Sequence, residues 1–291
     1  MTTADALVSA EAAAGTTPVA HRTDVRPPLP PSDIERGRRG PSTIRHGLTL
    51  AWRGVIKTIH SPEALIDVTL QPVIFLLLFV YVFGGAIAGN TTEYLQFALP
   101  GVLVQTVVFA SAGTGVGLAE DLHTGIFDRF RSLPISRSAP LVGAIMADLV
   151  RYLTSGVIML VLGVILGFRM HTGPLAVLAA MGLVMVFAFA LCWVFTALAM
   201  LVRQPRSVQG IGAMIMLPLT FGSNVFVPSS SMPGWLQAFV DVNPVSKVAD
   251  AVRGLLTGGP VAGPATTSLI AAAVIVAVFA PIAVTLYRKR A

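Results

Sequence analysis

The sequence predicts an all-α integral membrane protein with six transmembrane helices. Charged residues make up only 12% of the 291-residue chain, whereas a soluble domain carries about 25%. Six apolar stretches each reach the length of about 20 residues that a helix needs to cross a bilayer. Lys and Arg gather between these stretches, which is typical of a membrane protein and does not indicate nucleic-acid binding. Helices are expected because backbone groups in lipid must pair within each segment.

The chain divides into three predicted regions. Residues 1–40 are rich in proline, lack an apolar period and predict a disordered cytoplasmic tail. Residues 42–60 form a basic amphipathic pattern with Trp52, which favours a helix in the headgroup layer over a soluble helix packed on a partner. Residues 61–291 form the six-helix transmembrane domain. Its predicted spans are 64–88, 94–118, 139–167, 175–202, 208–227 and 266–287.

The distribution of positive charge predicts the orientation of the spans. Sixteen Lys and Arg residues lie on one predicted side of the membrane and three on the other. Because positive loops stay in the cytoplasm, both termini are expected there. The chain has far more Arg than Lys, which suggests a bacterial source and hence the bacterial plasma membrane.

Two segments between spans are longer than simple turns. In residues 120–133, a helical winding places Leu122, Ile126, Phe130 and Leu133 on one apolar stripe. Phe127 falls instead among polar residues, which indicates either a docking surface for another protein or a helix lying along the bilayer. Residues 228–264 predict short extracellular helices, with Asn243 as an N-cap and Pro244 at the first helical position. This segment either lies on the outer leaflet or dips back into the protein.

Several motifs resemble those of type-2 ABC exporter permeases. They are the segment GIFDRFRSLPISR at 125–137, the stretch from 148–151 to 167–169, and the series 233–235, 243–244 and 253–256. Within this family the sequence is most similar to daunorubicin/doxorubicin-resistance permeases, over about residues 45–290. The resemblance says less about substrate, because glycolipid and polysaccharide exporters are similar at this level.

The resemblance implies a six-helix protomer, a homodimer and a separate cytoplasmic ABC ATPase that carries the ATP and magnesium. It implies that residues 120–133 are the coupling helix that docks on this ATPase. The docking face would comprise Glu120, Thr124, Phe127, Asp128 and Arg131. The chain itself is expected to bind no cofactor, to contact membrane lipid and to have no catalytic residues.

Polar residues inside the spans are the other candidate sites. Asp148 and Arg151 share one helix face, as a structural ion pair or as a coupling or pathway element. Small residues in spans 2 and 5 allow close helix approach, so these spans are candidate walls of a translocation path. Gln105, Phe221 and Asn224 are the candidate lining residues, although ordinary helix packing is the stronger explanation for any single one of them.

Missing motifs narrow the function further. The chain has no G-x-x-x-x-G-K-[ST] sequence, and its five histidines show no ligand spacing, so neither a P-loop nor a metal site is predicted. The prediction is therefore the permease subunit of an ABC exporter for an amphipathic drug-like compound. The alternatives are an exporter of lipid, glycolipid or polysaccharide, a proton-coupled carrier using Asp148, or a membrane-embedded enzyme.

Overall fold

A computed structural model describes residues 62–124, 139–202 and 204–290 of the chain. Every regular element in these ranges is helical. The bounds are α3 Pro62–Leu78, η1 Phe79–Phe83, α4 Gly84–Ala88, α5 Thr91–His123, α7 Ala139–Ile165, α8 Pro174–Leu201, α9 Pro205–Phe221, η2 Ser229–Ser231, α10 Gly234–Val242, α11 Pro244–Thr257 and α12 Ala262–Arg290. The predicted tail and interfacial helix lie outside the described residues.

Five helices are long and apolar enough to cross a membrane. These are Thr69–Ala88, Thr91–His123, Leu141–Ile165, Pro174–Leu201 and Ala262–Tyr287. The predicted fifth span, 208–227, differs from the others because its helix α9 has only 17 residues. Gly222 ends α9, and residues 222–228 continue as an irregular segment. The described chain therefore contains five helices of spanning length, and α9 falls just short of that length.

Helix starts follow local capping chemistry. The Asn90 side chain accepts a 2.6 Å hydrogen bond from the backbone N–H of Glu93 and so caps α5. Asn243 accepts from the N–H of Val245 at 2.9 Å, with Pro244 at the first helical position, which confirms the predicted start of α11. Pro174 and Pro205 likewise occupy the first helical positions of α8 and α9, without a side-chain cap before them.

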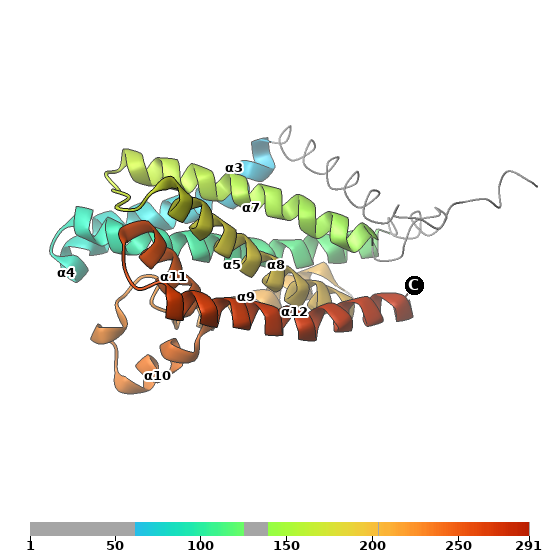
Figure 1. The fold of residues 1–291 in the computed structure, drawn as a ribbon. Helices are drawn as coiled ribbons and strands as arrows, with labels where there is room; N and C mark the ends of the chain where they lie inside the picture. The colour runs from blue at the N-terminus through green and yellow to red at the C-terminus, as the bar shows by residue number, and fades with distance from the viewer. Residues whose placement is uncertain (1–61, 125–138, 203, 291) are drawn as a thin grey trace, which may run out of the picture. The chain divides into compact units, whose positions relative to one another are not determined.

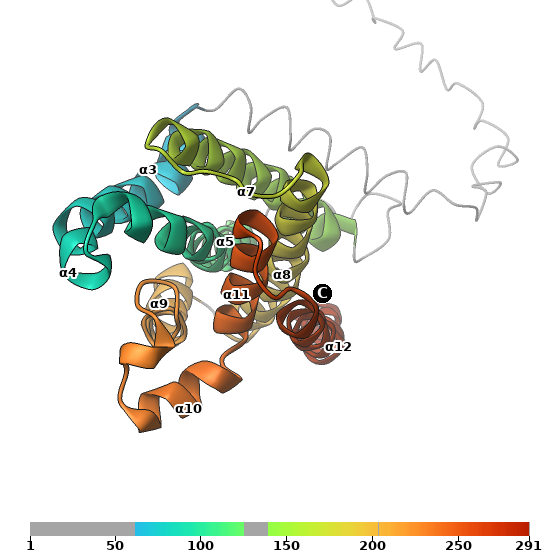
Figure 2. The same cartoon turned by 60° about the vertical axis from the view of Figure 1, so that its left-hand side comes forward.

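Helix α5 lies at the centre of the bundle, surrounded by α3, α7, α8, α9 and α11 (Figure 2). Two glycines let neighbouring backbones approach it. A Cβ on Gly115 would lie 2.8 Å from the carbonyl oxygen of Phe195, and a Cβ on Gly101 would lie 2.6 Å from that of Val225. Glycine at these positions therefore places α8 and the segment after α9 directly against α5.

The outer helices turn large apolar side chains outward, as lipid contact requires. On α12 the exposed residues include Leu269, Ile270 and Val274, and on α7 they include Val161 and Ile165. Helix α12 packs mainly on α8 and α11. Figure 1 shows α4 and α10 at the end of the bundle opposite the C-terminus. These two ends are called the α10 end and the C-terminal end below.

Helix α11 is the element between α9 and α12 that is inserted most deeply. Val245, Val248, Val252 and Leu256 are fully buried, and α11 contacts α5, α8 and α12. Of the two predicted arrangements for residues 228–264, α11 thus follows the one that dips back into the protein. Helix α10 differs, since Trp235 and Val242 on it are among the most exposed apolar residues.

Candidate functional site

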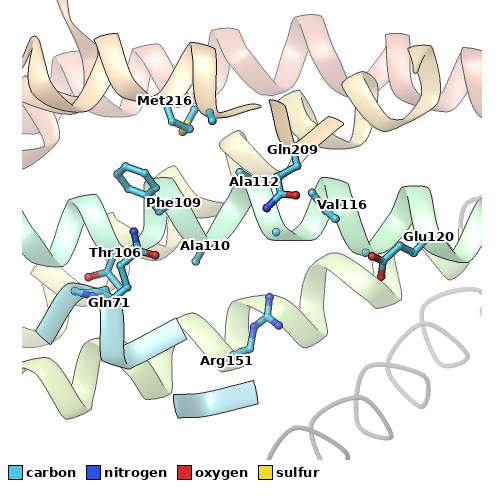
Figure 3. A pocket seen from close by; sticks show the side chains of 14 residues that line it. Gln71, Thr106, Phe109, Ala110, Ala112, Val116, Glu120, Arg151, Gln209 and Met216 are labelled. Carbon is cyan, nitrogen blue, oxygen red and sulfur yellow. The ribbon is translucent and has the colours of Figure 1, made fainter. Parts of the chain in front are cut away.

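A groove of about 510 Å³ opens between α3, α5, α7 and α9 (Figure 3). Helix α5 forms its floor, and the other three helices supply its walls. Its lining residues are Gln71, Pro72, Thr106, Phe109, Ala110, Ala112, Gly113, Val116, Gly117, Glu120, Arg151, Gln209, Ala213 and Met216. The volume falls within the range of small-molecule sites, about 300–1,000 Å³.

Small residues on α5 and α9 keep the groove open. Nothing lies within 4 Å of a Cβ built on Gly113 or Gly117, so these glycines face free space. Gly115, which lies between them in sequence, points the other way and packs on Phe195. The glycines that repeat every second residue in this helix therefore serve two faces, one for packing and one for the groove.

Polar groups line a site that is otherwise built from apolar helices. Gln71, Gln209 and Arg151 reach the groove from α3, α9 and α7, as Figure 3 shows. The Arg151 guanidinium lies 3.0 Å from the Asp148 carboxylate, and both side chains are 21% exposed. The arrangement can offer hydrogen bonds and charge to a bound molecule beside apolar surface from Phe109 and Met216.

A buried polar cluster supports the α7 wall. The Tyr152 hydroxyl donates to the carbonyl oxygen of Ala110 at 2.8 Å and also contacts the Thr114 hydroxyl. Thr114 in turn lies 3.6 Å from the Cys192 sulfur. Because Tyr152 and Cys192 are fully buried, these contacts satisfy polar groups that would otherwise destabilise the bundle. They hold α5, α7 and α8 in register next to Arg151.

An aromatic cluster lies further along α3, toward the α10 end. Phe75 follows Gln71 by one helical turn, and Phe79 stacks on Phe226 with a ring-centroid distance of 4.1 Å. Phe83 and Phe221 extend the cluster through Phe79 and Phe226, at 5.2 and 5.7 Å. Phe79 and Phe83 sit in the π-helical turn η1. Turns of this type often mark functional positions in helices.

The segment that carries Phe226 is pinned by a hydrogen-bond network. Arg253 lies 2.8 Å from Asp250 and donates to the carbonyl oxygens of Asn224 and Phe97 at 3.0 and 3.2 Å. Its guanidinium also lies 4.0 Å from the centroid of the Phe97 ring. The amide of Asn224 donates to Asp250 at 2.6 Å. Burial lowers the pKa of Arg253 below its ordinary value, and the neighbouring Asp250 carboxylate offsets this lowering only in part.

The predicted docking face falls only partly within the described residues. Phe127, Asp128 and Arg131 lie outside them. Glu120 does not begin a separate helix as predicted, because α5 continues without a break to His123. Thr124 is the C-cap of α5, and its N–H bonds to the carbonyl oxygen of Glu120. This continuation places Glu120 in the groove lining.

The three predicted path residues are not brought together. Gln105 is buried in α5, and its side-chain oxygen has no hydrogen-bond partner in the described part of the chain. Asn224 is buried in the Arg253 network, and Phe221 is half exposed in the aromatic cluster. None of the three lines the groove, so their role in a path stays a prediction.

Sequence reasoning missed the groove residues Gln71 and Gln209 and the network around Arg253. The two glutamines carried a signal, because uncharged polar residues within apolar spans often face the interior of a bundle. No such signal marked Arg253, since its i,i+3 spacing from Asp250 equally predicts a solvent-exposed ion pair on the polar face of α11.

Comparison with known proteins adds independent information. Residues 46–257 match the ABC-2 type transporter family. The daunorubicin resistance ABC transporter permease protein DrrB1 of Streptomyces coeruleorubidus is 45% identical over 84% of this chain and 86% of its own length. In Mycobacterium tuberculosis, the doxorubicin resistance ABC transporter permease protein DrrB is 29% identical over 81% of this chain and 87% of its own. The probable doxorubicin resistance ABC transporter permease protein DrrC from the same species is 29% identical over 68% of this chain and 72% of its own length.

Proposed function

Since this chain belongs to the ABC-2 type transporter family, it is the membrane-spanning permease of an ATP-driven exporter, and we propose that it exports amphipathic, hydrophobic drug-like compounds. The permease has no ATPase domain and binds no cofactor itself; ATP is hydrolysed by a partner ABC ATPase. The 45% identity to a permease named for daunorubicin resistance supports this substrate class. Membership of this family excludes the two alternatives from other classes, the proton-coupled carrier and the membrane-embedded enzyme.

The groove is the substrate site in this proposal, and its composition is the observation that carries the argument. Phe109, Met216 and the α5 glycines offer apolar surface and space. Gln71 and Gln209 offer amide groups on opposite walls. A site of this kind suits a molecule with both apolar and hydrogen-bonding parts.

The aromatic cluster is the outer closure of the path in this proposal. It follows the groove along α3, and it joins η1 to the segment after α9 through the Phe79–Phe226 stack. Phe221, predicted from the sequence as a path residue, belongs to this closure. Phe226 is the fixed side, because its carbonyl oxygen accepts a 2.7 Å hydrogen bond from the Tyr94 hydroxyl. The π-helical turn under Phe79 and Phe83 is the side that moves.

The proposed orientation puts the C-terminal end of the bundle in the cytoplasm of a bacterial cell. The Lys and Arg residues near this end, including Arg206 and those at 288–290, support it through the positive-inside rule. Helix α9 and residues 222–227 together then make the fifth crossing in chain order, which brings the total to six. The 17 residues of α9 rise about 25 Å, and the segment after it covers the rest of the hydrocarbon core. Reporter fusions after residues 90 and 245 should read as external. An internal reading at either position would overturn this orientation.

The proposed assembly is two permeases with two ATPases. Exposed apolar side chains on both rims of the groove support a second permease there, namely Leu70 and Ile74 on α3 and Met214 and Leu217 on α9. Thr124, Phe127, Asp128 and Arg131 carry the proposed contact with the ATPase. Phe127→Ala should reduce ATPase co-purification and transport together while leaving the membrane level of the permease unchanged. Normal co-purification would remove Phe127 from the docking face.

Transport in vesicles tests the function directly. Inside-out vesicles that contain the permease and its ATPase should take up a fluorescent hydrophobic amphiphile when ATP is added. Vesicles with a P-loop-inactive ATPase are the control. A fluorescent phospholipid and a fluorescent glycolipid serve as competing substrates. If ATP drives movement of the lipids but not of the amphiphile, the lipid-exporter alternative replaces this proposal.

A further inference from the structure

We propose that the Glu120 carboxylate makes the groove selective for amphiphiles that carry a positive charge. This inference rests on the proposed function, since it assumes that the groove receives the substrate. It also changes the role of Glu120, which the sequence had assigned to contact with the ATPase. Its basis is the location of Glu120, the balance of charge in the groove and the free space beside the carboxylate.

Glu120 lies in the last turn of α5, where the groove reaches the C-terminal end of the bundle. Val116 and Gly117 precede it on the same floor, and Arg151 faces the groove from α7 (Figure 3). The Glu120 side chain is exposed, so a molecule that enters from this end meets it early. This position corresponds to the mouth of the groove.

The charges of the lining do not cancel. Among the residues that the structure describes, Glu120 and Arg151 are the two charged members of the lining. The Arg151 guanidinium is neutralised by Asp148 at 3.0 Å, whereas Glu120 has no ion-pair partner within residues 62–124, 139–202 and 204–290. The groove therefore carries a local excess of one negative charge in a chain whose net charge is +6. A cationic group gains from this excess, and an anionic group is repelled.

The floor beside Glu120 can receive the apolar part of the same molecule. Gly113 and Gly117 have no atoms within 4 Å of an added Cβ, so a bulky group can lie flat against α5. Phe109 stands 11 residues from Glu120, which corresponds to about 16 Å along the helix. The geometry thus suits a molecule with a cationic head at the mouth and an apolar body that reaches Phe109.

Two aromatic probes separate charge from hydrophobicity. Rhodamine 6G is a cationic aromatic amphiphile, and Nile red is a neutral one. In ATP-driven vesicle uptake, Glu120→Gln should raise the KM for rhodamine 6G about fivefold, as expected for the loss of one partly exposed ion pair. The KM for Nile red should stay within twofold of its original value. Glu120→Asp should restore most of the affinity for rhodamine 6G.

Two controls distinguish this role from contact with the ATPase. Asp241→Asn makes the same change of charge on α10, outside the groove lining and outside residues 120–133, and should leave both KM values unchanged. Co-purification of the ATPase with Glu120→Gln should equal that of the unaltered permease. If Glu120→Gln impairs both probes equally and weakens co-purification, or changes neither KM, charge selection by Glu120 is refuted.

Equilibrium binding separates this inference from the proposed function. Fluorescence anisotropy of rhodamine 6G with the purified permease–ATPase complex needs no transport. If ATP drives uptake of neither probe, the proposed function fails, but the binding measurement still decides the role of Glu120. Binding of rhodamine 6G should weaken about fivefold in Glu120→Gln and should weaken with added salt in the unaltered protein. Equal affinity in both proteins would overturn the inference.

Discussion

Replacing Arg253 by methionine should loosen the segment that follows α9. The change keeps most of the side-chain volume but removes the ion pair with Asp250 at 2.8 Å. It also removes the hydrogen bonds to the carbonyl oxygens of Phe97 and Asn224. Both carbonyls then lose a charged donor, and Asp250 keeps only the amide of Asn224 as a partner within the described ranges.

The magnitude follows from the burial of this pair. The side chains of Arg253 and Asp250 are 16% and 33% exposed, so the pair is intermediate between a buried and a surface ion pair. Breaking a buried pair costs about 3–5 kcal/mol, and a surface pair contributes about 0–1 kcal/mol. We therefore expect Arg253→Met to lower the free energy of unfolding by about 3 kcal/mol. For a chain of this size that corresponds to a fall in Tm of about 6–12 °C.

Thermal unfolding of the detergent-solubilised protein, followed by tryptophan fluorescence, measures this effect. Lys247→Met is the matched control, because Lys247 on the same helix lies 3.9 Å from Asp241, whose side chain is 71% exposed. The control should shift Tm by less than 2 °C if its pair contributes under about 0.5 kcal/mol. An Arg253→Met protein as stable as Lys247→Met would refute the account of the network.

Three further outcomes follow from the packing around the groove. Asp148→Arg and Arg151→Asp should each lower the free energy of unfolding by about 3 kcal/mol as single changes, and the double swap should recover most of the Tm. A double swap that stays stable but no longer transports would assign the pair to coupling. Phe79→Ala should lose about 0.5–1.5 kcal/mol from its stack and should let trapped dye leak from proteoliposomes without ATP, whereas Phe79→Leu should leak less. Equal leakage from the two variants would argue against an aromatic closure. Gly115→Ala should cost about 1–3 kcal/mol by overpacking, while Gly113→Leu should keep the Tm but block transport; the opposite pattern would contradict the assignment of the two faces of α5.

Several features of the fold could be predicted because their causes are local. Long apolar runs must be helical in lipid, which explains why five of the six predicted spans correspond to helices of spanning length. The start of α11 at Asn243 and Pro244 depends on a side chain and a ring that act within two residues. The family motifs were equally readable, since they are contiguous stretches of sequence.

Other features depended on contacts between distant residues. The sequence suggested that residues 208–227 form one continuous span, but residues 222–227 leave the helix, and the backbone of Val225 packs against Gly101. Residues 120–123, expected at the start of a separate helix 120–133, form the last turn of α5, while residues 125–133 lie outside the described ranges. In both cases the apolar pattern extends across the boundary, so periodicity alone could not locate the end of the helix.

The sequence by itself determined that this is an all-helical membrane permease of the ABC-2 type, because hydropathy, charge placement and motifs are properties of neighbouring residues. Only the tertiary structure decided which residues share the groove. Gln71, Glu120, Arg151 and Gln209 come from four helices, and their meeting depends on how those helices rotate and pack around α5. The physical reason is that helix rotation is decided by close contacts such as that of Gly115 with Phe195, which join residues 80 positions apart.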